Sequence, residues 1–255
     1  MACVAKQYGL TRPIIGDGII ISQGRHLLQE MFVPSFIPND FCPGSKKVTI
    51  LTGPNSSGKS VFMKQLGLIQ YMGQIGGFVP AEMAQIVLVD KLLTRMNTKD
   101  ASVSGESTFS FELRQMKNAL EAATGNSLLL IDEFGKGTSP EDGIALLAAL
   151  VKYLMELPEE ERPWVLIITH FREVYQLLAE HEEHINWLWM QVTVGEDQVT
   201  YQYRATLGKS ESSLALQCAK KAGIPQSILK RAKELESIVE SGTLLYEVQR
   251  DGKDN

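Results

Sequence analysis

The residues best suited to do chemistry lie between Gly53 and Ser60, where the sequence reads Gly-Pro-Asn-Ser-Ser-Gly-Lys-Ser. This run follows a β-branched segment, 48–52, and precedes a segment, 61–71, whose apolar residues have helical spacing. A glycine-rich turn between a strand and a helix lets backbone N–H groups surround phosphate oxygens, and the helix N-terminus adds positive potential. We therefore expect a phosphate-binding loop (P-loop), with Lys59 on the β- and γ-phosphates and Ser60 on Mg²⁺; its residues are Gly53, Pro54, Asn55, Ser56, Ser57, Gly58, Lys59 and Ser60.

A pair of acids, Asp132 and Glu133, ends the apolar run at 128–131. Asp132 can hold Mg²⁺ through the ion's water shell, and Glu133 can accept a proton from an attacking water molecule. Adjacent acids favour an ATPase that activates water over a small-molecule kinase, which must exclude water. Taken alone, the pair is as well explained by two surface acids at a strand end, but the P-loop upstream favours the catalytic interpretation.

Two further side chains have both a catalytic and a structural interpretation. His170 follows the apolar run at 165–169. Because the ends of parallel strands share one edge of a sheet, we expect His170 near the γ-phosphate; the alternative is a cap on the following helix. Ser107 lies in the run Ser-Gly-Glu-Ser-Thr-Phe at 104–109, and spacing alone favours an N-cap of the helix that follows.

The elements that must position these groups alternate between strands and helices. Short apolar runs predict strands at 14–22, 48–52, 86–89, 92–96, 127–131 and 165–169, and helical spacing predicts helices at 61–71, 108–123 and 143–157. This order predicts an α/β fold in which helices flank a doubly wound, mainly parallel sheet. A hairpin is expected at 191–205, and two tail helices at 212–222 and 226–241. The last helix has an apolar stripe that must dock on the body or on another subunit, formed by Ile228, Ala232, Leu235 and Val239.

Composition limits the classes of function. The chain has 255 residues, of which 44% are hydrophobic and 22% charged, which suits one large domain with a small appendage. Its net charge of −5 gives no domain-wide surface for nucleic acid. The three cysteines are widely spread and are expected to be reduced thiols, not metal ligands. No run of 18 apolar residues is present, so no membrane span is expected.

Together the motifs resemble those of the C-terminal ATPase domain of the MutS family. Beside the P-loop, the matching runs are Gly24-Arg-His26, Phe36-Ile-Pro-Asn-Asp40, Gly77-Phe-Val-Pro-Ala-Glu82, Gly105-Glu-Ser-Thr-Phe109, Asp132-Glu-Phe-Gly-Lys-Gly-Thr138, Thr169-His-Phe171 and Ala222-Gly-Ile-Pro225. The resemblance extends from about Tyr8 to Gly242. Ser56-Ser57 and Phe134-Gly-Lys136 resemble the meiosis-specific branch, whose member works as half of a heterodimer on recombination junctions.

The resemblance implies roles that spacing does not. Members are ABC-type P-loop ATPases that pair head to tail, so Ser107 would face the γ-phosphate of the partner's ATP, which replaces the capping interpretation. Asn55 would lie against the phosphates and help to order the attacking water or Mg²⁺. Phe36 and Ile37 match a loop that touches adenine, and Tyr203 matches the aromatic or histidine placed against that base.

The resemblance also implies an organisation. It divides the chain into a stub of the lever region (1–10), a P-loop ATPase domain (11–207) and a helical dimerisation tail (208–255). We expect the chain to be a piece of a longer, nuclear protein that contacts DNA through segments outside it. The expected partner is a second MutS-homologue subunit. Leu27, and Ser213-Leu-Ala215, depart from the family pattern.

Two functions follow from these expectations. In the first, ATP-driven dimer closure controls a DNA clamp in mismatch repair or meiotic recombination. In the alternative, the chain is an ATP-dependent dimerisation module with little intrinsic hydrolysis. Hydrolysis can be slow even when every catalytic residue is present, so the sequence is compatible with this alternative.

Overall fold

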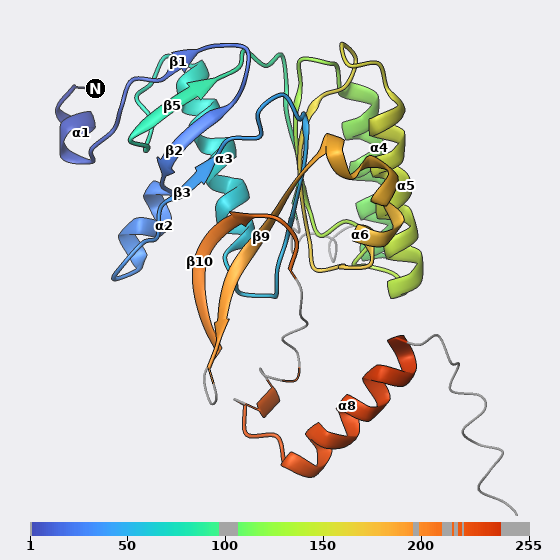
Figure 1. Ribbon diagram of the computed structural model, residues 1–255. Coiled ribbons are helices and arrows are strands. Elements are labelled where there is room, and N and C mark those ends of the chain that lie inside the picture. The colour runs from blue at the N-terminus through green and yellow to red at the C-terminus, as the bar shows by residue number, and fades with distance from the viewer. Residues whose placement is uncertain are drawn as a thin grey trace, which may run out of the picture. The chain divides into compact units, whose positions relative to one another are not determined.

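The computed structural model describes residues 2–96, 107–195, 199–210, 216, 219–220 and 222–240 (Figure 1). These residues form two compact units, one made of 1–191 with 202–210 and the other of 192–201 with 211–255. The first unit contains all the residues of the candidate site and both sheets, except that residues 192–194 and 199–201 of the larger sheet belong to the second unit. The predicted division into an ATPase domain (11–207) and a dimerisation tail (208–255) stays a prediction.

A six-stranded sheet forms the centre of the first unit, in the order β10-β9-β4-β8-β7-β6. The strand β4 (Val48–Thr52) is buried along its whole length and pairs in parallel with β8 (Trp164–Thr169) and β9 (Ile185–Val194). On the other side of β8, the strand β7 (Leu128–Asp132) pairs in parallel with β8 and with β6 (Leu92–Arg95). The predicted mainly parallel α/β sheet is therefore confirmed.

The hairpin prediction at 191–205 was too short. The strand β9 begins at Ile185 and joins the sheet beside β4, and β10 (Val199–Leu207) is its neighbour. The polar Asn186 interrupts the apolar pattern at the start of β9, so the sequence did not indicate a strand there. In the fold, Asn186 is buried and donates a hydrogen bond to the Thr49 hydroxyl at 3.2 Å, so a polar residue is accommodated between two buried strands.

A second, four-stranded sheet was not predicted. Its order is β1-β5-β2-β3, with bounds Ile14–Ile15, Met83–Ile86, Ile20–Gly24 and Asn39–Phe41. The strand predicted at 14–22 is broken because the chain reverses there: β1 is parallel to β5 whereas β2 is antiparallel to it. The strand predicted at 86–89 is also displaced. Gln70 donates to the Val87 carbonyl, and Gln74 donates to the Val89 carbonyl and accepts from the Val89 N–H, so these side chains take the place of a neighbouring strand.

Helices cover both faces of the central sheet, and helix α3 lies between the two sheets (Figure 1). One apolar core surrounds α3 (Lys59–Gln74) and contains side chains from both sheets. On the opposite face, a second core packs under α4 (Thr108–Ala122), α5 (Pro140–Glu156) and α6 (Val174–Leu177). Shorter helices are α1 (Ala2–Gln7), α2 (Leu27–Phe32) and the 3₁₀ helix η2 (Ala179–His184).

In the second unit, helix α8 spans Gln226–Glu240, which agrees with the last predicted helix. Its residue Ile228 is exposed and Leu229 is buried, so the predicted stripe is not the only apolar part of this helix. The side chain of Val239, the residues after 240 and most of the helix predicted at 212–222 lie outside the described part of the chain. None of the described helices is long and apolar enough to cross a membrane.

Candidate active site

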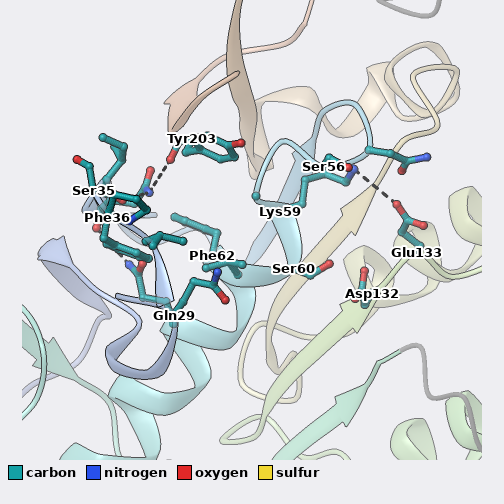
Figure 2. A pocket seen from close by; sticks show the side chains of 18 residues that line it. Gln29, Ser35, Phe36, Ser56, Lys59, Ser60, Phe62, Asp132, Glu133 and Tyr203 are labelled. Carbon is teal, nitrogen blue, oxygen red and sulfur yellow. Dashed lines mark hydrogen bonds and ion pairs between the residues drawn. The ribbon is translucent and has the colours of Figure 1, made fainter. Parts of the chain in front are cut away.

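A cavity of about 710 Å³ lies where the P-loop meets the carboxyl end of β7 (Figure 2). Segments from both sheets line it, and they include most of the residues that the sequence analysis singled out. The predicted residues that line the cavity are Phe36, Ile37, Asn55, Ser56, Gly58, Lys59, Ser60, Asp132, Glu133 and Tyr203. We call the part of the cavity formed by Lys59, Ser60, Asp132 and Glu133 the phosphate end. We call the part formed by Phe36, Ile37 and Tyr203 the base end.

The P-loop has the backbone conformation that a phosphate cradle requires. Gly53, Ser56 and Gly58 have positive φ angles of 155°, 64° and 100°. A Cβ at Gly53 would lie 2.9 Å from Cβ of Met190, and one at Gly58 would lie 3.2 Å from Cδ1 of Tyr203, so glycine is required at both positions. The Ser57 hydroxyl closes the loop by donating to the Pro54 carbonyl at 2.8 Å. This loop at the N-terminus of α3 fits the triphosphate of a nucleotide.

Lys59 is buried at 5% exposure and reaches back across the loop. Its Nζ donates to the carbonyls of Gly53 at 2.8 Å and Pro54 at 3.0 Å, and lies 3.5 Å from Oε1 of Glu133 (Figure 2). Burial lowers the pKa of the Lys59 ammonium, and the neighbouring Glu133 carboxylate opposes that shift. The cation is thus held at the mouth of the loop by two neutral carbonyls and, at longer range, by the Glu133 carboxylate, and the phosphates of a nucleotide would compete with them.

Asp132 and Ser60 together offer a small set of oxygen ligands. They point toward each other across the cavity (Figure 2). Burial raises the pKa of Asp132, and the neighbouring Ser60 hydroxyl opposes that rise. Among the described residues, no group of three or more His, Cys, Asp or Glu is placed to hold a metal. A hydroxyl and a carboxylate fit Mg²⁺, which keeps several waters and takes its remaining ligands from phosphates.

Glu133 is held by its backbone N–H and by contacts on both carboxylate oxygens. Its φ is 49°, and its N–H donates to the Ile168 carbonyl of β8 at 2.9 Å. Oε2 lies 2.6 Å from Nζ of Lys136, and Oε1 lies 3.7 Å from Nδ1 of His170. His170 first, and then Lys136 and Lys59, lower the pKa of Glu133 to about 2 against the opposing effect of burial. The 3.7 Å contact with His170 is longer than an ordinary hydrogen bond, so the pair with Lys136 is the tighter one.

His170 is placed beside Glu133 and not at a helix cap. The following helix, α6, has Glu173 at its N-cap position. The His170 ring instead lies on Phe171, with centroids 4.4 Å apart. The structure therefore brings His170 to the edge where it was predicted, whereas its catalytic role remains a prediction.

The base end joins segments that are far apart in sequence. Asn39, which the sequence analysis did not assign a role, is buried and bonds to both segments. Its Nδ2 donates to the carbonyls of Ile37 at 3.1 Å and Tyr203 at 2.9 Å, and its Oδ1 accepts from the Ala205 N–H at 2.7 Å. Tyr203 has a φ of 53°, an uncommon value that turns its ring toward Gly58. Only the motif Phe36–Asp40 signalled Asn39 in advance.

Ser107 does not line the cavity. It is the N-cap of α4, where its Oγ accepts from the Ser110 N–H at 3.0 Å, so the capping interpretation is confirmed. Its role across a subunit interface remains a prediction, and residues 104–106 of its motif lie outside the described part of the chain. Arg95 and Glu112 were not predicted to take part in the site. Their side chains form a buried ion pair 2.9 Å apart behind the Asp132–Gly135 turn.

Comparison with known proteins bears on what this site does. The model of MutS domain V matches residues 49–240. DNA mismatch repair protein MutS of Salinibacter ruber is 40% identical over 248 residues, which cover 94% of this chain and 27% of that protein. MutS protein homolog 5 of Caenorhabditis elegans is 37% identical over 254 residues, which cover 97% of this chain and 19% of that protein. The chain therefore spans only about a fifth to a quarter of these relatives.

Proposed function

The chain belongs to the MutS family, and from this premise we propose that it binds ATP with Mg²⁺ and hydrolyses it, as the ATPase part of a DNA mismatch-repair or recombination protein. The observation that carries the proposal is the convergence of Lys59, Ser60, Asp132 and Glu133 in one cavity. ATPase activity is a property of this domain at the level of the family. The roles of individual residues and the part played by the whole protein are our proposals.

Binding begins at the P-loop. The backbone N–H groups of 53–60 surround the phosphate oxygens, and Lys59 exchanges its carbonyl partners for the β- and γ-phosphates. Ser60 and Asp132 hold Mg²⁺, which neutralises charge that develops on the phosphates. Phe36, Ile37 and Tyr203 enclose the adenine, and Asn55 lies against the phosphates.

Hydrolysis depends on Glu133. With a pKa of about 2, its carboxylate is ionised at neutral pH and can orient water through a hydrogen bond, but it is a weak base while His170, Lys136 and Lys59 hold it. When the phosphates take Lys59, Glu133 loses one of its cationic partners and becomes more available to water. His170 lies 3.7 Å from the same carboxylate oxygen that Lys59 approaches, and it orients this oxygen.

We propose that a second subunit completes the site through Ser107. Its exposed hydroxyl stands at the N-terminus of the 15-residue helix α4, where the helix dipole favours an approaching anion. In this arrangement each ATP lies between two subunits, and closure of the dimer on ATP controls a clamp on DNA. The tail helix α8 contributes to the dimer through its partly exposed apolar side chains.

The dimer proposal is tested by mixing damaged subunits, provided that the chain self-associates. A Ser107→Ala chain and a Lys59→Ala chain each form dimers with two damaged sites. A mixed dimer combines both lesions at one site and leaves the other intact, so hydrolysis should recover on mixing. Hydrolysis per subunit that does not depend on protein concentration, with no recovery on mixing, would show that a lone chain does the chemistry.

The finer assignment is to the meiotic branch, with a different MutS homologue as partner and a nuclear location. It is supported by Ser56-Ser57 and Phe134-Gly-Lys136 and by the relative from C. elegans, although bacterial MutS proteins are equally similar. This assignment predicts weak self-association and activity that rises when the ATPase domain of the other subunit is added. DNA contacts lie in segments outside this acidic chain, so nanomolar binding of the chain alone to a junction at physiological salt would contradict the proposal.

One observation favours the alternative of a dimerisation module with little hydrolysis. In the described arrangement both oxygens of Glu133 are occupied by cations, Lys136 on one and Lys59 on the other. Single-turnover hydrolysis with and without a second subunit separates the two functions. An ATPase shows a chemical step that the second subunit accelerates, whereas a module binds ATP and dimerises but releases it unchanged in both conditions.

A further inference from the structure

Behind the site lies a buried ion pair that the proposed chemistry does not use. Arg95 ends β6 and Glu112 lies in the second turn of α4, and their exposures are only 5% and 2%. Nη2 of Arg95 lies 2.9 Å from Oε1 of Glu112. Charges are kept out of water only with partners at good geometry, so both side chains are held in one arrangement.

The same two side chains hold the backbone of the turn that carries Glu133. Nη1 of Arg95 donates to the Asp132 carbonyl at 2.5 Å, and the Gly135 N–H donates to Oε1 of Glu112 at 2.8 Å. The two anchor points therefore stand on either side of Glu133. Because Glu133 has a φ of 49°, a conformation uncommon for a residue other than glycine, the turn requires such outside contacts to maintain it.

We propose that Arg95 and Glu112 are positioning residues for hydrolysis, which orient the Glu133 carboxylate by fixing the backbone before and after it. This inference rests on the proposed ATPase function. Neither residue lines the cavity, so they act through the turn and not on the nucleotide. They determine how often Glu133 is in the reactive orientation, and they leave phosphate binding to the P-loop.

The pair also joins the turn to the helix that Ser107 caps. A Cβ at Gly137 would lie 3.1 Å from Oε2 of Glu112 and 3.2 Å from Cα of Phe109, so the turn and the first part of α4 are in close contact. A displacement of α4 is consequently transmitted to Glu133 through charged hydrogen bonds and direct packing. If a second subunit moves α4, the orientation of Glu133 changes with it.

Two variants separate positioning from folding. Glu112→Gln keeps the size and one oxygen acceptor but removes the charge opposite Arg95. The double variant Arg95→Met/Glu112→Met replaces the pair by apolar side chains, a change that commonly preserves stability, and removes both hydrogen bonds to the turn. The matched control is Glu121→Gln, the same change in the same helix at an exposed pair with Lys117.

The first measurement compares kcat with the affinity for ATP·Mg²⁺ in the full chain, together with any second subunit that its hydrolysis requires. We expect kcat to fall about 10- to 100-fold in both variants, as for a misoriented catalytic group. The dissociation constant should change less than about twofold, and Glu121→Gln should match the wild type. A folded double variant with normal kcat, or equal losses of kcat and affinity, would overturn the proposal.

The second measurement needs no hydrolysis. Hydrogen exchange of the Gly135 amide reports directly on its bond to Glu112, and we expect protection to fall at least about tenfold in the double variant. Normal protection there would overturn the proposal, even if the double variant is less stable. A wild-type chain that never hydrolyses ATP would refute the proposed function by itself, whereas the exchange result still decides whether the pair holds the turn.

Discussion

At the phosphate end of the cavity, Lys59, Asp132 and Glu133 are 5%, 8% and 9% exposed, whereas Tyr203 at the base end is 47% exposed. The phosphate end takes its geometry from neighbouring parallel strands and the loop that follows one of them. The base end is assembled from two distant segments that the single residue Asn39 ties together. We infer that the phosphate end determines turnover and much of the affinity, and that the base end contributes affinity alone.

The largest effect should come from Glu133→Gln, which keeps the shape of the side chain but removes the base. Hydrolysis should fall by about 10²- to 10⁴-fold while ATP·Mg²⁺ still binds. Single-turnover kinetics and nucleotide titration measure the two quantities on the same protein. Glu156→Gln, an exposed acid on α5, serves as the control, and a normal rate in Glu133→Gln would place the base elsewhere.

Next in size is Lys59→Ala, which removes a buried cation from the phosphate end. Loss of a charge-assisted contact of ~1.5–3 kcal/mol should weaken ATP binding about 10- to 150-fold. Calorimetry or a fluorescent nucleotide measures the change, with Lys64→Ala, an exposed lysine of the same helix, as the matched control. Equal ATP affinity in Lys59→Ala and the wild type would remove the basis for the P-loop assignment.

Asn39→Ala tests whether the base end is held as one unit. It removes three hydrogen bonds at a buried position, so the free energy of unfolding should fall by ~1–3 kcal/mol. We expect ATP affinity to fall about tenfold, or ~1.4 kcal/mol, with kcat unchanged at saturating ATP. Asn39→Asp, which keeps the acceptor for Ala205, should lose less stability, and a fall in kcat would show that the two ends are not independent.

The smallest effect should come from Tyr203→Leu. A half-exposed ring stacked on a base contributes ~1 kcal/mol, at the low end of measured values, so ATP should bind about fivefold more weakly. Tyr203→Phe keeps the ring and should bind ATP normally. Inorganic triphosphate lacks a base and should bind both variants equally; a loss of triphosphate binding would indicate that Tyr203 supports Gly58 of the P-loop instead of the base.

The two ends also differ in how far the sequence predicted them. The P-loop part of the phosphate end is formed by consecutive residues, so a local pattern predicts it: 48–52 was predicted as a strand and is β4, and the loop 53–60 follows it. Residue types at strand ends then predicted Asp132, Glu133 and His170 beside that loop. The base end was accessible only through family resemblance, because no local pattern signals that Asn39 bonds to Tyr203, 164 residues away.

Other departures from the predictions have local causes. Helix α3 begins at Lys59 and not at 61, since Gly58, in a left-handed conformation, ends the loop directly before it. Helix α5 begins at Pro140 and not at Gly143, because Ser139 caps it and proline suits the first turn. The Arg95–Glu112 pair could not be foreseen, since charged residues in amphipathic segments are usually exposed and burial depends on the tertiary fold.

The pairing of β4 also sets when the site can form during synthesis. The P-loop is translated before both strands that flank β4, which are encoded more than 100 residues after it. At about 5–20 residues per second, the nascent P-loop waits roughly 5 to 25 seconds for both neighbours. Until β9 has emerged from the ribosome, the apolar strand Val48–Thr52 lacks one edge partner, so its unpaired edge is prone to aggregation during this interval.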